Sequence, residues 1–344
     1  MLIHYVLTKV CNLECNHCIR EYNSQEIEFM NFDNAVLGIK KLDTYFPKGY
    51  NLAFSGGEPT IHPYFEKLLK FSLNNSICNI GICTNGVSSF FDEAIFRYDP
   101  KTSIFIQVSL DGAETSHDKI RGNGVFKRAI RNLKNLINAG FTVSVASTVT
   151  KDNLDSMFIL KEILLSLKVL KWRINMALPY GSAEDSQCLN ITQWNDFVQQ
   201  INLNNTSNMK ISCYKLYDFK TLDSLNEHQL QSVTSIRTMQ KMFNCGSGNR
   251  KIYIYPDMKV YGCTCLKEFP FGNLIDQDLN DVFNSENAQL IKNYTILERS
   301  PCKQCKYLKM CNGGCIGMSK IGFNQIGIGD IRCPKLQQKI RGEQ

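Results

Sequence analysis

Residues 2–23 read LIHYVLTKVCNLECNHCIREYN, an apolar run followed at once by a loop with three cysteines in eight residues. The apolar run at residues 2–8 is typical of a β-strand. The cysteines are Cys11, Cys15 and Cys18. A closed structural zinc site takes four protein ligands, and disulfides use cysteines in pairs. Three thiols on one loop therefore indicate a metal centre that leaves one position open.

The first half of the chain alternates strand-like and helix-like segments. Regular alternation of this kind implies parallel strands joined by right-handed crossovers. Six units are too few for a closed eight-stranded barrel, so we expect an α/β fold with a partial (β/α)6 TIM-like barrel, open on one side. The predicted strands are residues 2–8, 50–56, 79–86, 102–112, 141–150 and 171–181, and the helical patterns are residues 32–46, 62–75, 89–98, 124–140 and 153–168.

With 344 residues, the chain exceeds what one core usually serves, so we expect more than one domain. The barrel should occupy residues 1–180. Residues 181–244 form a bridging region with a helix near 192–204 and a strand within 209–219. Residues 245–344 are dense in cysteine and glycine and are predicted to be a small second domain with a β-hairpin.

The composition favours a cytoplasmic protein. Hydrophobic residues make up 43% and charged residues 21% of the chain, as in ordinary globular proteins. No apolar run is long enough to cross a bilayer, and the first residues lack the features of a secretory signal. Fifteen cysteines then indicate metal ligands in a reducing compartment. The net charge of +7 is scattered along the chain, so neither nucleic acid nor a membrane is an expected partner.

Polar and glycine-rich segments follow three further predicted strands. They read SGGEP at residues 55–59, TNG at 84–86 and SLDG at 109–112. The carboxyl ends of parallel strands meet around one mouth of a barrel, where active sites lie. Each segment alone is a common turn. Together with the cysteine loop, they place ligating or polar groups at four consecutive strand ends.

The spacing C-x3-C-x2-C after the first strand, with the ring of His17 before the last cysteine, resembles the signature of the radical S-adenosylmethionine (SAM) enzymes. The resemblance covers roughly residues 1–180. It implies that three thiolates hold three irons of a [4Fe–4S] cluster. The fourth iron would bind the amino and carboxylate groups of SAM, and reduction would release a 5′-deoxyadenosyl radical.

The same resemblance implies a set of SAM contacts. Gly56, Gly57 and Glu58 would run along the methionine amino group, because a strand edge without β-carbons lets a ligand lie against the backbone. Asp111 and Arg121 either face the ribose and carboxylate or are, respectively, a turn residue and an exposed loop arginine. The further expected contacts are Thr84 and Asn85 lining the pocket, Ser109 beside the ribose and carboxylate, and His17 near the adenine.

Seven cysteines in the last hundred residues resemble the SPASM extension of peptide-modifying radical SAM enzymes. That family usually has a glycine at the position of Met258, and this departure bears on the hairpin turn. Cysteine spacing alone also fits a pair of zinc sites; attached to a SAM-cluster barrel, it implies two auxiliary [4Fe–4S] clusters and three clusters in all. By resemblance, Cys302, Cys305, Cys311 and Cys333 would hold the distal cluster, and Cys245, Cys263 and Cys315 the nearer one.

Seven thiolates leave one of eight iron positions without a protein ligand. Either Cys265, in GCTCL, completes the nearer cluster, or the substrate binds there. In an extended strand, side chains at i and i+2 lie on the same face but are separated along the strand. A turn is therefore needed to bring Cys265 and Cys263 to one centre. The remaining cysteines fit no ligand spacing and are predicted to be buried apolar thiols: Cys78, Cys83, Cys188 and Cys213.

The resemblance implies a maturase that abstracts a side-chain hydrogen from a ribosomally made peptide and installs a carbon–carbon, thioether or ether cross-link. A flavodoxin or ferredoxin would supply electrons. No leader-binding segment precedes the first strand, so the barrel mouth, the bridge or a separate protein would hold a leader peptide. One alternative is a dehydrogenase of the sulfatase-maturing type, disfavoured by Thr264 where that type carries Asp; another is a zinc-binding interaction module. No catalytic base is assigned.

Overall fold

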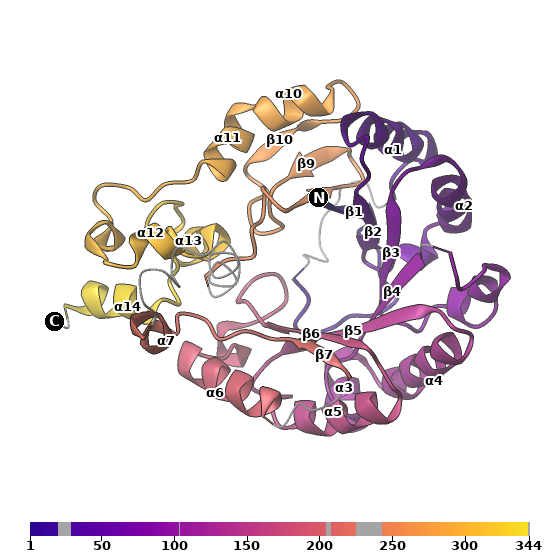
Figure 1. Ribbon diagram of the computed structural model, residues 1–344, viewed down its shortest axis with the longest axis horizontal. Coiled ribbons are helices and arrows are strands. Elements are labelled where there is room, and N and C mark those ends of the chain that lie inside the picture. The colour runs from indigo at the N-terminus through magenta and orange to yellow at the C-terminus, as the bar shows by residue number, and fades with distance from the viewer. Residues whose placement is uncertain (20–28, 103, 204–207, 225–242, 343–344) are drawn as a thin grey trace.

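A computed structural model describes residues 1–19, 29–102, 104–203, 208–224 and 243–342. Ten strands form one sheet, in the order β10-β9-β8-β1-β2-β3-β4-β5-β6-β7. Figure 1 shows the strands lining an incomplete ring with helices on its outer side. The strands are β1 (Leu2–Thr8), β2 (Asn51–Gly56), β3 (Asn79–Thr84), β4 (Ile104–Ser109), β5 (Thr142–Val149), β6 (Lys171–Met176), β7 (Lys210–Ser212), β8 (Lys251–Ile254), β9 (Lys259–Tyr261) and β10 (Pro270–Asn273).

The predicted partial barrel is confirmed in β1 to β6, which pair in parallel in chain order. Each strand except β3 is followed by an α-helix before the next element of the sheet. The helices of this part are α1 (Phe32–Tyr45), α2 (Phe65–Asn75), α3 (Glu114–Arg121), α4 (Val125–Asn138), α5 (Ser156–Ser166) and α6 (Ile191–Asn202).

Two local expectations differ from the structure. Residues 89–98 form two 3₁₀ turns, η2 (Ser89–Phe91) and η3 (Ala94–Arg97), and no α-helix. The α3 helix was not predicted, because it buries only His117 and Ile120 and so lacks the apolar periodicity that marks a helix in a sequence. It ends at Gly122, whose φ of 112° suits glycine.

The sheet continues beyond the six expected strands. In the bridging region β7 pairs in parallel with β6, which confirms a strand within residues 209–219. At the other edge β8 pairs in parallel with β1, and β9 and β10 follow antiparallel. The expected hairpin is therefore present as β8 and β9, but it extends the barrel sheet directly.

The hairpin turn adapts to Met258 at the position where a glycine was expected. Met258 has a φ of 65°, a left-handed conformation that is unusual for a side-chain-bearing residue. Its side chain is fully buried and reaches α1, since a β-carbon built on Gly38 would lie 2.8 Å from Met258 Cε. Burial of this side chain against the barrel offsets the backbone cost of the conformation.

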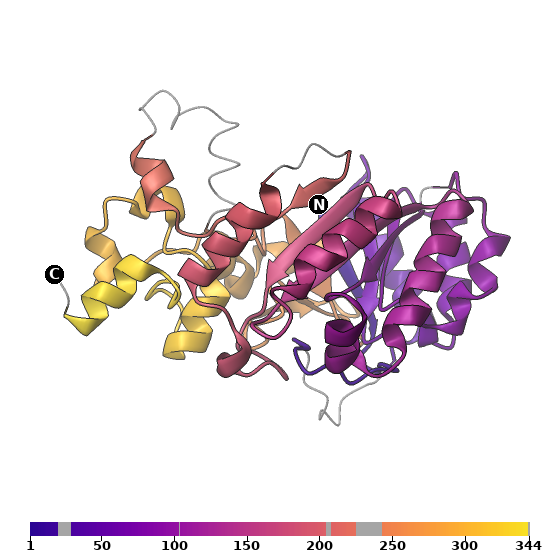
Figure 2. The same ribbon diagram turned by 90° about the horizontal axis from the view of Figure 1, so that it is seen from below.

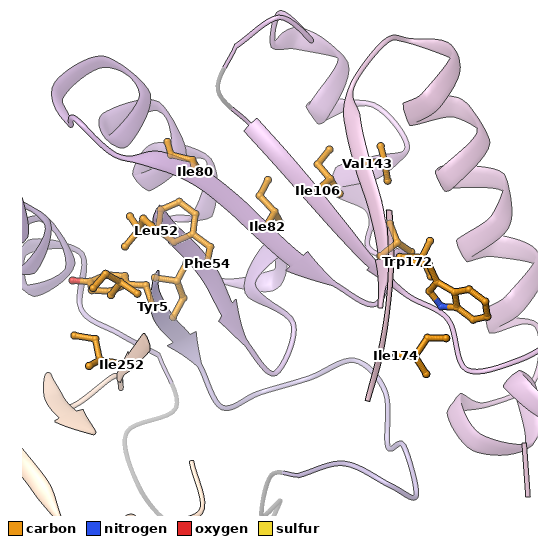
Figure 3. Packing of buried hydrophobic residues seen from close by; sticks show 14 of the residues in the cluster. Tyr5, Leu52, Phe54, Ile80, Ile82, Ile106, Val143, Trp172, Ile174 and Ile252 are labelled. Atoms are coloured by element: carbon orange, nitrogen blue, oxygen red, sulfur yellow. The ribbon is translucent and has the colours of Figure 1, made fainter. Parts of the chain in front are cut away.

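One large buried core runs through the barrel and the hairpin (Figure 3). It includes the fully buried side chains of Tyr5, Phe54 and Trp172 from the barrel and Ile252 from β8. The Tyr5 hydroxyl donates to the carbonyl of Ala35 at 2.9 Å, which ties β1 to α1. Removal of these apolar surfaces from water is the main stabilising contribution to such a core.

The C-terminal part has short helices joined by loops. Figure 2 shows its last segment, residues 301–342, at the opposite end of the molecule from α2 and α4. Within the described residues, no helix has the length and apolar character needed to span a membrane. The helices of the C-terminal part are α10 (Leu279–Asn284), α11 (Glu286–Lys292), α12 (Leu308–Cys311), α13 (Ile316–Phe323) and α14 (Pro334–Arg341). In the bridging region, α7 (Phe219–Asp223) lies beside α12 and α14.

Candidate active site and auxiliary cysteine pockets

The loop with Cys11, Cys15 and Cys18 is braced by several elements around the barrel mouth. The Asn16 N–H donates to the carbonyl of Ile120 in α3 at 3.2 Å, and Ser182 N–H, after β6, donates to the Cys18 carbonyl at 2.8 Å. Asn85, after β3, donates from Nδ2 to Asn12 Oδ1 at 2.8 Å. The strand ends and the cysteine loop thus meet at one place, as expected from a parallel sheet.

Gly56 and Gly57 are required by the cysteine loop itself. A β-carbon on Gly56 would collide with the carbonyl of Thr8, and one on Gly57 with the carbonyl of Val10. The close approach lets the backbone carbonyls before the cysteines accept hydrogen bonds: Gly57 N–H donates to Thr8 O at 2.8 Å and Glu58 N–H to Val10 O at 2.9 Å. The structure therefore adds a reason for the glycine pair that the sequence did not supply.

Glu58 joins the ends of β2 and β3. Its side chain is fully buried, and its carboxylate accepts from Thr60 Oγ1 at 2.6 Å, from Thr84 Oγ1 at 2.9 Å and from Asn85 N–H at 2.8 Å. Burial raises the pKa of Glu58, and these hydrogen bonds oppose the rise only in part. Thr84 and Asn85 are thereby held beside the cysteine loop.

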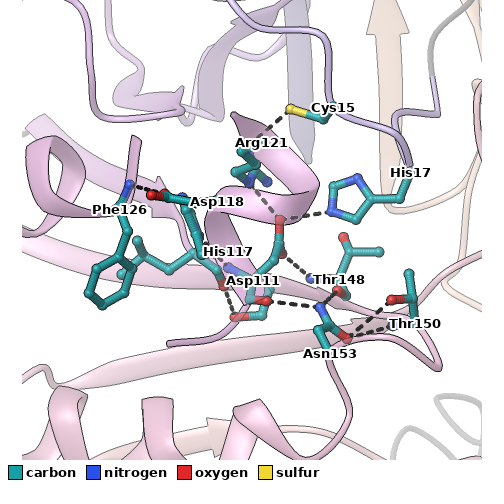
Figure 4. Close-up of polar contacts among 12 residues, drawn as sticks. Cys15, His17, Asp111, His117, Asp118, Arg121, Phe126, Thr148, Thr150 and Asn153 are labelled. Atoms are coloured by element: carbon teal, nitrogen blue, oxygen red, sulfur yellow. Dashed lines mark hydrogen bonds and ion pairs between the residues drawn. The ribbon is translucent and has the colours of Figure 1, made fainter. Parts of the chain in front are cut away.

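Asp111, two residues after β4, is the centre of a buried polar network shown in Figure 4. Its Oδ2 lies 2.8 Å from His17 Nε2 and accepts from Arg121 Nε at 2.6 Å, while Oδ1 accepts from Thr148 N–H at 2.7 Å. Arg121 also directs Nη1 to Cys15 Sγ at 3.8 Å. Asp111 and Arg121 therefore link the end of the strand to the cysteine loop. Arg121 is neither exposed nor in a loop.

Charge pairing decides the ionisation of this carboxylate. Complete burial opposes the charged form, but the Arg121 guanidinium and His17 outweigh it and hold the pKa of Asp111 well below its usual range. A buried charge requires such compensation. Ser109, the last residue of β4, is half-buried.

Three residues of the network were not identified from the sequence: His117, Thr148 and Asn153. His117 Nδ1 accepts from the Asp111 N–H at 3.0 Å, and Asn153 Nδ2 donates to the Asp111 carbonyl at 2.9 Å. Asn153 is fully buried. An asparagine shortly after a fifth predicted strand was the one available signal, since polar residues after strands mark the same mouth.

The C-terminal cysteines form two groups around two pockets. The first pocket, of about 40 Å³, is lined by Cys302, Cys305, Cys311 and Cys333. The second, of about 110 Å³, is lined by Cys245, Cys263 and Cys315. We call them the distal and the near pocket. Of the cysteines without ligand spacing, Cys78, Cys188 and Cys213 are buried as predicted, and Cys83 is half-buried.

A buried network separates the two pockets. Asp330 is fully buried; it accepts from the Tyr217 hydroxyl at 2.5 Å and from the Cys315 N–H at 3.3 Å. Arg332 pairs with the same carboxylate at 2.6 Å. Tyr217 lines the distal pocket and Cys315 the near pocket, so Asp330 connects the walls of both.

A family model of the radical SAM superfamily matches residues 5–159, and a model of the SPASM iron–sulfur cluster-binding domain matches residues 245–306. The chain belongs to the radical SAM superfamily. It is a radical SAM enzyme with a C-terminal SPASM domain. The interpretation as a zinc-binding interaction module is thereby set aside.

Curated relatives of this radical SAM enzyme span most of its length. It is 25% identical over 325 residues to the mycofactocin maturase MftC of Mycolicibacterium smegmatis, covering 90% of this chain and 76% of the relative. It is 24% identical over 358 residues to the Fe-coproporphyrin III synthase of Methanosarcina barkeri, covering 97% and 88%.

Solved structures share the fold. Streptococcus suis SuiB bound to its precursor peptide SuiA superposes with a TM-score of 0.78 at 17% identity, over 97% of this chain and 75% of SuiB. The structure of anSMEcpe with bound AdoMet superposes with a TM-score of 0.74 at 17% identity, over 100% and 96% of the two chains. At this identity the likeness concerns the fold.

The radical SAM and SPASM domains imply iron–sulfur clusters, and the donor set fits them. Within the described part of the chain, no three His, Cys, Asp or Glu side chains are placed to hold a single metal ion. Cysteines that share a pocket without converging on one ion suit a cluster in which each thiolate binds a different iron.

The region around the first cysteine loop also fits a polar ligand. His17 Nδ1 and Asn16 Oδ1 are buried and have no hydrogen-bond partner among the described residues. Buried polar atoms are seldom left unpaired. Both belong to the cysteine loop, so a ligand with hydrogen-bonding groups, such as SAM, would satisfy them there.

Proposed function

We propose that this radical SAM enzyme modifies a ribosomally synthesised peptide by abstracting a side-chain hydrogen, from a β-carbon, and installing a carbon–carbon, thioether or ether cross-link. The observation that carries the proposal is the division of seven SPASM cysteines between a distal and a near pocket. Cross-linking removes a hydrogen atom, a proton and an electron from the peptide. The electron needs an acceptor, which two auxiliary clusters supply.

The comparisons support a peptide as substrate. The name of one relative is mycofactocin maturase, and another relative is the sporulation killing factor maturation protein SkfB of Bacillus subtilis. SuiB, which shares the fold, was solved with a precursor peptide bound. A precursor peptide is accordingly the proposed partner, with its leader held by the chain itself or by a separate leader-binding protein.

Each residue of the mouth has a proposed role. Cys11, Cys15 and Cys18 would ligate three irons of the first cluster. When bound, the reduced cluster and SAM supply the 5′-deoxyadenosyl radical. The remaining roles are those of SAM contacts or of residues that position them: His17, Gly56, Gly57, Glu58, Thr84, Asn85, Ser109, Asp111 and Arg121.

Glu58 and Asp111 would act mainly as positioning residues, because their oxygens already accept hydrogen bonds from the protein. Glu58 holds Thr84 and Asn85 in place. Asp111 orients His17 through Nε2 and leaves Nδ1 for a ligand. The barrel would exclude water around the radical, as the chemistry requires.

Three [4Fe–4S] clusters are proposed, with Cys302, Cys305, Cys311 and Cys333 at the distal one and Cys245, Cys263 and Cys315 at the near one. Anaerobically purified protein should then contain about twelve irons with matching sulfide. A flavodoxin or ferredoxin would reduce the first cluster.

The decisive experiment is mass spectrometry of a small peptide encoded beside the gene, after co-expression with this enzyme. A product lighter by two hydrogens, without an aldehyde and formed only with intact Cys15, supports cross-linking. An aldehyde-reactive product would instead support the dehydrogenase of the sulfatase-maturing type. Thr264 at the position of that type's Asp favours the cross-link.

The relative named Fe-coproporphyrin III synthase supports a second candidate, since the match spans 97% of this chain and 88% of that protein. Two further relatives are named AdoMet-dependent heme synthase, and one matches over 91% of this chain. In this case the substrate would be an iron porphyrin. Anaerobic incubation with Fe-coproporphyrin III, SAM and a reductant, followed by chromatography of the pigments, tests the heme-synthase form of this candidate: heme would form, and the peptide would remain unchanged.

A further inference from the structure

Cys265 lies in a turn beside the near pocket. Strand β9 ends at Tyr261, and the Leu266 N–H closes a turn on the carbonyl of Cys263 at 3.2 Å. Within this turn the Cys265 N–H donates to Cys263 Sγ at 3.4 Å. The turn required to bring Cys265 and Cys263 to one centre is therefore present.

The surroundings of Gly317, at the start of α13, show that Cys265, Cys263 and Cys315 lie close together. A β-carbon built on Gly317 would lie 3.1 Å from Cys265 Cβ, 3.7 Å from Cys263 Sγ and 3.8 Å from Cys315 Sγ. All three cysteines thus border the same small space, and the absence of a side chain on Gly317 keeps that space open. Gly317 itself lines the near pocket.

Cys265 also differs in its surroundings from the four cysteines without ligand spacing. It is 7% exposed, its N–H donates to Cys263 Sγ, and it borders Gly317 together with Cys263 and Cys315. Thiolates held this close to one another would repel, and binding to shared irons removes that repulsion. By contrast, Cys213 is similarly buried, and burial alone raises the pKa of its thiol.

We propose that Cys265 is the fourth protein ligand of the near auxiliary cluster, together with Cys245, Cys263 and Cys315. The inference rests on the two auxiliary clusters of the proposed function. Its consequence is that every iron of this cluster has a protein thiolate. The peptide then has no open iron to bind, and the near cluster serves the reaction by accepting an electron.

The test uses full-length protein with Cys11, Cys15 and Cys18 replaced by alanine, so that only auxiliary clusters contribute. In this parent, Cys265→Ala is compared with Cys213→Ala as a matched buried-cysteine control. Each protein is analysed for iron and sulfide, then reduced and examined by electron paramagnetic resonance with and without ¹³C-labelled cyanide as a probe for an open iron. Cys265→Ser adds a variant with an oxygen ligand.

The parent and Cys213→Ala should hold about eight irons and show no ¹³C coupling. Cys265→Ala should either show ¹³C coupling at an opened iron or fall to about four irons, and Cys265→Ser should keep its iron with a changed near-cluster spectrum. A parent that already binds cyanide at an iron, or a Cys265→Ala protein identical to Cys213→Ala, would overturn the ligand assignment alone. A parent with four irons or fewer would overturn the two auxiliary clusters as well.

Discussion

Asp111 illustrates how one residue organises the mouth of the barrel. Its carboxylate contacts His17 from the cysteine loop, Arg121 from α3 and the backbone of Thr148 after β5. The sequence indicated its importance only through its position after a strand. Its partners come from segments up to 94 residues away in the chain, and therefore local pattern could not identify them.

His117 leads to a prediction about pH. Burial, aided by the positive charge of Arg121, lowers the pKa of His117 to about 4, whereas an unfolded histidine has a pKa of about 6.5. Between these values the unfolded state binds more protons, so stability should fall as pH decreases from about 6.5 towards 4. The loss attributable to this residue is at most about 3 kcal/mol.

The measurement is urea unfolding of reduced, iron-free protein at several pH values, for the wild type and His117→Asn. The asparagine keeps an acceptor for the Asp111 N–H but does not titrate. The wild type should lose more stability than the variant across this range. Equal pH slopes for the two proteins would contradict the prediction.

At the scale of elements, the end of β2 is shaped to receive the cysteine loop. Gly57→Ala places a methyl group against the Val10 carbonyl, so the loop must shift. We expect this variant to lose most of the iron bound by Cys11, Cys15 and Cys18, about four atoms per chain, while the auxiliary clusters persist. Iron analysis and SAM-dependent changes in the paramagnetic resonance spectrum measure this effect.

Gly81→Ala in β3 is the matched control. Its β-carbon would meet its nearest neighbour, the backbone of Ala53, at 3.6 Å, an ordinary contact, so iron content should stay unchanged. Loss of iron in both variants would indicate that general destabilisation, rather than collision with the loop, is responsible.

The turn between β8 and β9 provides a second prediction at this scale. Met258→Ala removes a fully buried side chain and should destabilise the protein by about 2–5 kcal/mol. Met258→Gly loses the same contacts, but glycine adopts the left-handed conformation of this position without the steric cost of a β-carbon. Removing that cost stabilises the protein by about 1 kcal/mol. Glycine should therefore be better tolerated than alanine, in contrast to the usual order within strands.

Thermal and urea unfolding of the three proteins test this order. The wild type should be the most stable and Met258→Ala the least. If Met258→Gly were more stable than the wild type, the contact between Met258 and α1 would contribute less than the strain of the turn. That result would refute our explanation of why methionine replaces glycine here.

At the scale of the whole molecule, the barrel and the C-terminal part share one sheet and one core. Strand β8 pairs with β1, and α10 packs on α1, where Lys41 Nζ donates to the Gln277 carbonyl at 2.9 Å and the rings of Tyr45 and Phe283 lie 5.2 Å apart. Beyond the hairpin, a smaller apolar cluster contains Tyr294, Ile296, Cys302 and Leu336, and the last two of these residues line the distal pocket.

This uneven distribution of buried apolar side chains predicts the effect of iron removal. The distal pocket has few buried apolar residues, so its cysteines would depend on bound iron for their arrangement. After chelation under reducing conditions, amide hydrogen exchange should rise strongly in α12, α13 and α14 and little in β2 to β5. A uniform rise across the barrel would contradict this view.

The sequence by itself indicated the parallel barrel and the three-cysteine loop, and its resemblance to a known family pointed to the C-terminal cysteines. These predictions use the spacing of apolar residues and cysteines within short segments of the chain. Local backbone geometry sets such spacings, because helices and strands have fixed periods. The sequence did not reveal α3, whose buried face is only two residues, nor the 3₁₀ turns after β3.

Only the tertiary structure decided whether a turn brings Cys265 beside Cys263, why glycines border the cysteine loop, and how a methionine adopts a left-handed conformation. Each depends on atoms from distant segments, such as Gly317 beside Cys263 and Gly38 beneath Met258. Packing between remote residues sets the space available to a side chain, and that space is not encoded in any single stretch of the chain.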